Sequence, residues 1–208
     1  MEVNYRIINK DQFKISSWSG GTTTQLFIYP ENSSYEARNF TWRISSATVD
    51  LEESNFTQLS DYNRILMVIK GRLILNHEGQ NPVCLCELEQ DKFDGNVNTT
   101  SKGKVVDFNV MMKKGSSTGK AETIKVDGKS TLTTIFQDGT ESGYENCTEV
   151  YYNIQGEIAL SISESKKIIL KNNEMLLIDY KNEGLPLLFD SYNSCDEDVI
   201  LIRTKLYY

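Results

Sequence analysis

The sequence consists of many short runs of apolar and β-branched residues, separated by turns that contain glycine or asparagine. Residues 63–76 form one such segment, divided at Lys70-Gly71, and residues 149–162 form another, divided at Gly156. The runs have the length and composition of strands, and helical periodicity is almost absent. A chain of 208 residues with this pattern is predicted to be all-β, either a sandwich or a barrel.

Several of the turns look like β-hairpins, because two apolar runs flank a residue type that tolerates a positive φ. Lys70-Gly71, Asp127-Gly128 and Asn172-Asn173 are the clearest cases. We therefore expect the strands on either side of each of these turns to pair with one another.

The chain contains a short internal repeat. Ile69-Lys-Gly-Arg-Leu-Ile-Leu75 is matched by Ile154-Gln-Gly-Glu-Ile-Ala-Leu160, and the Gly/Ser-rich residues 113–120 are the best linker between the two halves. We expect two β-barrels that pack as one unit. The first comprises residues 1–115, including the N-terminal segment, and the second comprises residues 116–208.

Two predicted strands, residues 40–49 and residues 106–111, each carry a polar face. Side chains alternate between the faces of a strand, so residues two apart point the same way. A strand face with an arginine beside a serine either meets water or lines a polar pocket. We predict that both faces line one cavity, with Arg43 and Ser45 from the first strand and Asp107, Asn109 and Met111 from the second.

A guanidinium offers a planar fork of donors that matches a carboxylate, which makes Arg43 the candidate anion-binding group. Asp107 is expected to hold Arg43 in place when the pocket is empty, and Arg64 can close the same mouth. A polar network that only ties two strands together is an equally open interpretation. The predicted ligand-binding residues are Arg43, Ser45, Arg64, Asp107, Asn109 and Met111, with Trp18, Thr22 and Phe93 around them.

The chain has a single histidine, His77, in the polar segment Asn76-His-Glu-Gly-Gln80. A multi-histidine metal site is therefore excluded, and we expect His77 to lie exposed in a loop. A G-x-S-x-G elbow and a phosphate-binding loop are both missing from the sequence. We predict no bound metal and no cofactor.

The formal net charge of -7 argues against nucleic acid and anionic membrane surfaces as partners. The first residues contain no apolar segment typical of a signal peptide, and no stretch reaches transmembrane length. We expect a cytoplasmic protein.

Four segments, taken in order, resemble the HutD/Ves family of bicupins. They are Trp18-Ser-Gly-Gly-Thr22, Trp42-Arg-Ile-Ser-Ser-Ala-Thr-Val49, Asn63-Arg64 leading into Val68-Ile-Lys-Gly71, and Asp107-Phe-Asn-Val-Met111. The resemblance implies two cupin-like β-barrels, of the jelly-roll type, packed as one compact bicupin. It also implies a bacterial protein associated with histidine utilisation or stress.

The resemblance and the Arg43 argument together imply a binding protein rather than an enzyme. Its ligand would be a small carboxylate or amide, such as a formylated or formimino-glutamate, and its role would be regulatory. One alternative is a metal-free isomerase, epimerase or lyase with Asp107 or Asp61 as general base. A protein-interaction scaffold without a ligand is a third reading. A homodimer also stays open, because Tyr207 and Tyr208 can mediate self-association.

Overall fold

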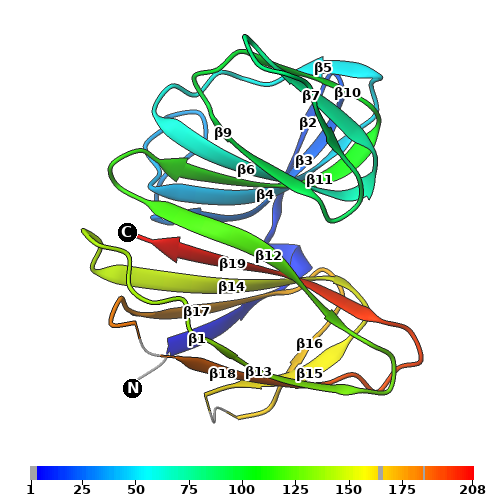
Figure 1. Cartoon of the computed structure of the whole chain (residues 1–208), viewed down its shortest axis with the longest axis vertical. Helices are drawn as coiled ribbons and strands as arrows, with labels where there is room; N and C mark the ends of the chain where they lie inside the picture. The colour runs from blue at the N-terminus through cyan, green and yellow to red at the C-terminus, as the bar shows by residue number, and fades with distance from the viewer. Residues whose placement is uncertain (1–3, 164–165, 185) are drawn as a thin grey trace. The chain divides into compact units, whose positions relative to one another are not determined.

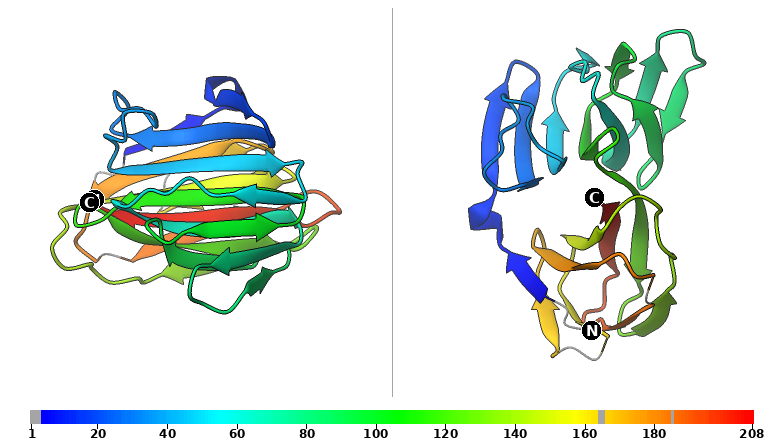
Figure 2. Two further views of the ribbon diagram at one scale, coloured as in Figure 1. Left: turned by 90° about the horizontal axis from the view of Figure 1, so that it is seen from above. Right: turned by 90° about the vertical axis from the view of Figure 1, so that its left-hand side faces the viewer.

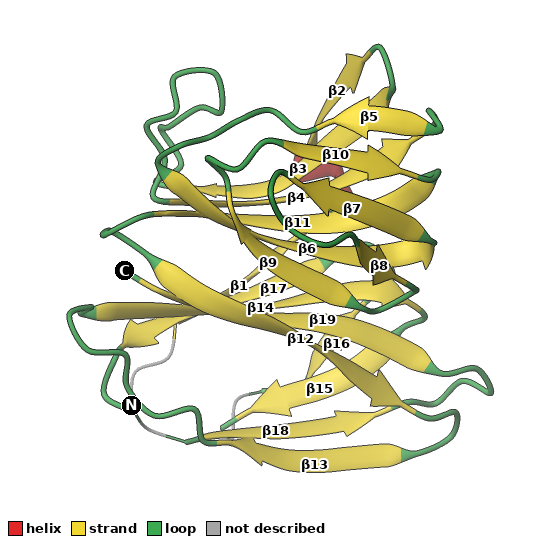
Figure 3. Cartoon of the chain, turned by 45° about the horizontal axis from the view of Figure 1, so that its top comes forward, coloured by secondary structure: helices red, strands yellow, loops and turns green. Residues whose placement is uncertain are grey.

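The structure, a computed structural model, describes residues 4–163, 166–184 and 186–208. Within these ranges the chain is built from β-strands, and the one helical element is a single 3-10 turn at Lys10–Gln12 (Figure 3). The all-β prediction is confirmed. The described residues include no helix that is long and apolar enough to cross a membrane.

The first barrel comprises residues 12–118 and contains two sheets (Figure 1). A six-stranded sheet has the order β2-β3-β4-β11-β6-β9, and a four-stranded sheet has the order β5-β10-β7-β8. The strands are β2 Lys14–Trp18, β3 Gly21–Tyr29, β4 Trp42–Val49, β5 Glu53–Asn55, β6 Tyr62–Gly71, β7 Leu73–His77, β8 Val83–Leu85, β9 Gln90–Asp94, β10 Thr99–Lys102 and β11 Val105–Lys113.

The second barrel comprises residues 1–11 and 119–208 and also contains two sheets (Figure 2). A five-stranded sheet has the order β1-β17-β14-β19-β12, and a four-stranded sheet has the order β13-β18-β15-β16. The strands are β1 Asn4–Ile8, β12 Thr118–Val126, β13 Thr131–Phe136, β14 Asn146–Gln155, β15 Ile158–Ile162, β16 Ile168–Leu170, β17 Met175–Lys181, β18 Leu187–Tyr192 and β19 Val199–Tyr207.

The N-terminal segment differs from the expected division at residue 115. Strand β1 pairs with β17 over its whole length, from Asn4 opposite Asp179 to Ile8 opposite Met175. A strand has to satisfy its backbone donors and acceptors on a neighbour, and this neighbour is in the second barrel. Residues 4–11 therefore belong to the second barrel, although they precede the first in sequence.

The three predicted hairpins are wrong, because the chain changes sheets at each of these turns. Strands β6 and β7 flank Gly71 but lie in different sheets, as do β12 and β13 around Gly128 and β16 and β17 around Asn173. Gly71 has φ +97° and Asn173 has φ +61°, so the predicted left-handed conformation is present at both. The positive φ at these turns lets the chain pass from one sheet to the other, and it does not form a hairpin.

The two barrels share one strand plan. The order β4-β11-β6-β9 in the first corresponds to β12-β19-β14-β17 in the second, and β5-β10-β7-β8 corresponds to β13-β18-β15-β16. Gly71 and Gly156 of the repeat both lie at the step from the larger sheet to the smaller one, with φ of +97° and +84°. The repeat therefore marks equivalent corners of two barrels with the same topology.

The inward-facing side chains of the first barrel are apolar at one end of the strands and mostly polar at the other. On β6, the side chains of Arg64, Leu66 and Val68 alternate onto the inner face, so one strand passes from charged to apolar. Residues from both sheets fill the apolar end: Val49, Leu66, Val68, Leu73, Leu75, Leu85, Phe93 and Val105. The other end is left to polar side chains.

Candidate functional site

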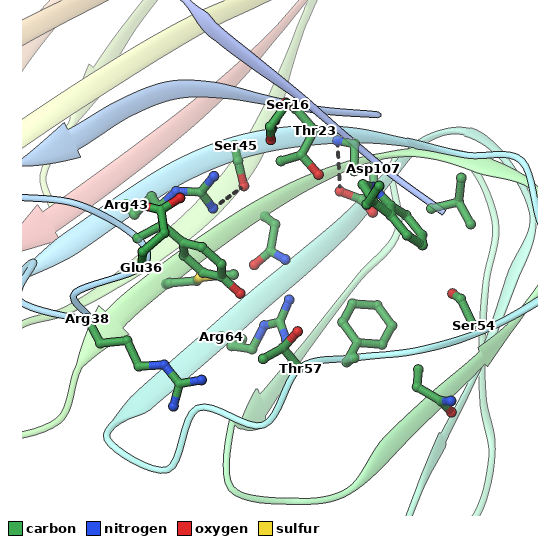
Figure 4. Close-up of a pocket in the computed structure, with 18 residues that line it drawn as sticks. Ser16, Thr23, Glu36, Arg38, Arg43, Ser45, Ser54, Thr57, Arg64 and Asp107 are labelled. Atoms are coloured by element: carbon green, nitrogen blue, oxygen red, sulfur yellow. Dashed lines mark hydrogen bonds between the residues drawn. The ribbon is translucent and has the colours of Figure 1, made fainter. Parts of the chain in front are cut away.

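The polar end of the first barrel encloses a cavity of about 480 Å³ (Figure 4). Strands β3, β4, β6 and β11 supply its inner wall, strands β2 and β5 add side chains beside it, and the loops 30–41 and 56–61 contribute side chains at its mouth. The cavity is lined by Ser16, Trp18, Thr23, Tyr35, Glu36, Arg38, Arg43, Ser45, Ala47, Val49, Ser54, Asn55, Phe56, Thr57, Arg64, Asp107, Asn109 and Met111.

The two polar faces expected from the sequence do meet in this cavity. Strand β11 lies between β4 and β6, so Met111 stands opposite Arg43 on one side and Arg64 on the other. Asn109 likewise stands opposite Ser45. Of the predicted ligand-binding residues, those that line the cavity are Arg43, Ser45, Arg64, Asp107, Asn109, Met111 and Trp18.

Thr22 and Phe93 do not line the cavity. Thr22 is exposed on β3, and its neighbour Thr23 points inward instead, because adjacent side chains on a strand face opposite ways. Phe93 is buried in the apolar end of the barrel, where its ring lies 5.4 Å from the Arg64 guanidinium. Phe93 therefore supports a cavity residue from behind.

Arg43 is buried on β4, with 5% of its surface exposed. Its Nε donates to Oε1 of Gln25 at 2.8 Å, its Nη1 donates to Oγ of Ser45 at 3.0 Å, and the guanidinium lies 4.7 Å from the Tyr35 ring. Burial lowers the pKa of Arg43 from its ordinary value. Neutral partners thus orient the guanidinium without cancelling its charge.

The expected contact of Asp107 with Arg43 is replaced by a different arrangement. Asp107 stands opposite Ala47 in the register, two positions along β4 from Ser45, and its Oδ1 accepts the Ala47 N–H at 3.3 Å. Burial raises the pKa of Asp107 to about 7, against the attraction of the Arg64 charge. Burial therefore favours the protonated form of Asp107 far more than for an exposed aspartate.

Arg64 is 4% exposed, packs against aromatic rings and forms no salt bridge among the described residues, although the charge of Asp107 acts on it. Its guanidinium is 4.7 Å from the Phe56 ring centroid, and burial lowers its pKa to about 10. At neutral pH it is charged, yet its Nε has no hydrogen-bond partner among the described residues. Figure 4 shows Arg64 on the same wall of the cavity as Arg43 and Asp107, with strand β11 between the two arginines.

Asn109 is the second cavity residue with unused hydrogen-bonding capacity. Its side chain is 6% exposed, and Oδ1 accepts no hydrogen bond within the described part of the chain. Buried polar atoms are normally paired, so an unpaired donor on Arg64 and an unpaired acceptor on Asn109 are unusual in one cavity. Together they can bind a molecule that offers both an acceptor and a donor.

His77 is buried, which corrects the expected exposed loop. It ends β7 with 4% of its surface exposed. Its Nδ1 is 2.9 Å from Oγ1 of Thr99, its Nε2 is 2.8 Å from Oδ2 of Asp91, and its ring lies 4.7 Å from that of Phe93. Both ring nitrogens have partners outside the cavity, and the ring packs behind Phe93.

Several cavity residues were missed by sequence reasoning. Thr23 could have been found from the alternation on β3, and so could Gln25, which does not line the cavity but orients Arg43. No local pattern indicates Phe56 or the loop residues, because only the folded barrel brings their loops to the mouth. The remaining missed residues are Ser16, Tyr35, Glu36, Arg38, Ala47, Val49, Ser54, Asn55 and Thr57.

Several solved structures share the fold of this chain. The conserved protein PA5104 of Pseudomonas aeruginosa PAO1, described as of unknown function, superposes with a TM-score of 0.76 at 21% identity over 98% of both chains. HutD from Pseudomonas fluorescens SBW25 superposes with a TM-score of 0.65 at 18% identity over 97% of this chain and 98% of that one. Oxalate decarboxylase from Bacillus subtilis has a TM-score of 0.68 at 6% identity and covers 95% of this chain and 76% of that one.

The cavity does not fit the metal chemistry of that decarboxylase, whose Mn(II) centres are named with it. Manganese and iron sites use imidazole and carboxylate ligands. Here the inner wall offers two guanidinium groups, one carboxylate and one amide, and the guanidinium charges repel a cation. Over the described ranges, no three His, Cys, Asp or Glu side chains are grouped to hold a metal ion.

The relationship of the chain to known families rests on its sequence as well as its fold. No curated protein matches the chain. The family model described as HutD matches residues 10–191, which spans both barrels. The chain therefore belongs to the HutD family.

Proposed function

We propose that this HutD-family protein binds a small carboxylate or amide in the cavity of the first barrel. The proposal follows from the buried guanidinium of Arg64, whose Nε has no hydrogen-bond partner among the described residues and which shares a cavity wall with a second arginine, Arg43. A buried charge without an ionic partner is costly unless something else compensates it. An anionic ligand supplies that compensation, because a carboxylate matches the donor fork of a guanidinium.

Asn109 narrows the ligand chemistry. Its Oδ1, which has no partner in the part of the chain that the structure describes, is an acceptor, so it selects a ligand with an N–H or O–H group near the anionic end. A formylated or formimino-glutamate combines a carboxylate with such a group. With the family association, this supports a regulatory role in histidine utilisation, in which the protein senses an intermediate of the pathway. A scaffold role is disfavoured, since a filled first barrel was its expected sign.

A second candidate function is supported by Asp107 alone. A buried carboxyl group with a pKa of about 7 is suited to proton transfer at neutral pH. Turnover of a carboxylate substrate that is abolished in Asp107→Asn would establish a metal-free enzyme. Binding without turnover, kept in Asp107→Asn, would exclude this role.

A thermal-shift screen of carboxylate and amide intermediates of histidine breakdown tests the binding proposal. At least one compound is expected to raise the melting temperature of the wild type in a saturable way. The same compound should have no effect on Arg64→Ala or Arg43→Ala. Arg72→Ala, which removes an exposed arginine that does not line the cavity, is the control for general charge loss. If none of the compounds stabilises the wild type, the proposal fails.

A further inference from the structure

The sequence repeat extends into the strand register of both barrels. The ladder between β6 and β11 and the ladder between β14 and β19 are each interrupted once, beside Ile69 and Ile154 of the repeat. On the far side of these irregularities, both ladders pair residue by residue with the same spacing. Each inward position of one barrel therefore has a counterpart in the other. The counterparts are Arg64 and Glu149, Leu66 and Tyr151, Asn109 and Arg203, and Met111 and Lys205.

The second barrel holds a carboxylate at the counterpart of Arg64. Glu149 is fully buried and accepts four hydrogen bonds. Arg203 donates through Nε to Oε2 at 2.8 Å and through Nη2 to Oε1 at 2.7 Å. The hydroxyls of Tyr151 and Tyr180 donate at 2.7 and 2.8 Å. This is a complete binding site for a carboxylate.

The cluster around Glu149 contains equal numbers of positive and negative side chains. The cations are Arg203, Lys205 and Lys120, and the carboxylates are Glu122, Asp138 and Glu149. Arg203 also forms ion pairs with Glu122 and Asp138, and Nζ of Lys205 lies 3.7 Å from Oε1 of Glu149. The pKa of Asp138 is lowered to about 2, because hydrogen bonds and charges from Arg203 and Lys120 outweigh its burial. Loss of the Glu149 carboxylate would leave the cationic groups in excess.

The first barrel has the reverse arrangement. Arg64 stands where the second barrel has Glu149, and Asn109 stands where it has Arg203. Arg64 Nε and Asn109 Oδ1 lack hydrogen-bond partners in the described residues, whereas Arg203 and Glu149 satisfy each other. The two barrels thus differ in whether the chain supplies its own carboxylate.

We propose that Glu149 is a built-in occupant of a carboxylate site in the second barrel, equivalent to the open site of the first. The second barrel is closed to ligand by its own side chain. The chain therefore takes one anionic ligand, in the first barrel, a consequence that rests on the proposed function. The carboxylate site around Arg203 does not depend on it.

Chemical rescue of Glu149→Ala with sodium acetate tests this assignment. The substitution removes one methylene and the carboxylate, a fragment with the shape of acetate. We expect a lower melting temperature that acetate raises saturably, by about 3–6 °C at ten times its Kd. Sodium chloride at equal ionic strength should not reproduce the rise. Glu149→Gln, which leaves no space, should gain no more from acetate than from chloride.

Double variants locate the rescue. It should persist in Glu149→Ala with Arg64→Ala and disappear in Glu149→Ala with Arg203→Met. Glu149→Ala that folds only in acetate supports the proposal equally. Glu149→Ala that gains no more from acetate than from chloride, or a rescue that survives Arg203→Met, overturns it. If instead the rescue succeeds but no screened ligand binds the wild type, only the proposed function fails.

Discussion

Arg64 and Glu149 occupy equivalent positions in two barrels of the same topology, and they carry opposite charges. Glu149 has the partners that a buried carboxylate needs, whereas the guanidinium of Arg64 faces a cavity with an unpaired Nε among the described residues. The same fold thus contains one polar interior that is satisfied by its own side chains and one that is open to a ligand.

Arg64 should contribute more to ligand affinity than its neutral neighbours. Arg64→Ala is expected to weaken binding of a carboxylate ligand about 10- to 100-fold, because hydrogen bonds to charged groups contribute about 1.5–3 kcal/mol. Arg64→Lys should recover only part of this, since an ammonium cannot form the planar fork. Isothermal titration measures both. Equal affinities for the wild type and Arg64→Ala would contradict the role of Arg64.

Asp107 should make the folded state less stable as the pH rises. Its pKa increases from 3.8 in the unfolded chain to about 7 in the folded one, so the folded state binds the proton more tightly. This contribution is complete below pH 4 and is lost as the pH rises through 7. Urea unfolding at pH 5 and pH 8 should show Asp107→Asn gaining about 2–4 kcal/mol on the wild type at the higher pH. An unchanged difference between the two pH values would contradict this.

Gly21 should tolerate no side chain. Its φ is +149°, and an added Cβ would lie 1.9 Å from the carbonyl oxygen of Thr48 on β4. Gly21→Ala is expected to lower the unfolding free energy by about 2 kcal/mol or more, through both strain and the clash. Gly79→Ala is the matched control, because Gly79 has φ +76° with open space around it. Thermal unfolding should show a clearly smaller loss for the control.

Removing Arg203 alone should lower the unfolding free energy more than removing Arg203 together with its partner Glu149. Arg203→Met leaves the Glu149 carboxylate buried without its main cation, which costs about 3–5 kcal/mol of unfolding free energy. Adding Glu149→Gln removes the stranded charge and should restore part of this loss. Chemical unfolding of the two single variants and the double variant gives the coupling energy. Additive effects would show that the two groups do not act as a pair.

The fold and the polar wall of the cavity could be predicted from local patterns. Strand alternation alone placed Arg43, Ser45, Asp107 and Asn109 on inward faces, because a period of two is a property of the backbone. Which carboxylate meets which arginine depends on the register between strands, so the expected contact of Asp107 with Arg43 was wrong.

Sheet membership could not be predicted from the turns. A positive φ at Gly71 serves a hairpin or a corner between sheets equally well, and the choice depends on pairing with strands far away in sequence. The burial of His77 has the same origin. Its partners Asp91 and Thr99 reach it through strands β9 and β10, although its own segment resembles a loop.

A crystal structure with a ligand that stabilises the wild type tests the central claim most directly. We predict density for the ligand inside the first barrel, with its anionic group within hydrogen-bonding distance of the Arg64 guanidinium and its donor group near Oδ1 of Asn109. The second barrel should contain the Glu149–Arg203 pair and no ligand. A ligand bound elsewhere, or a first barrel that holds only water at saturating ligand, would contradict the account.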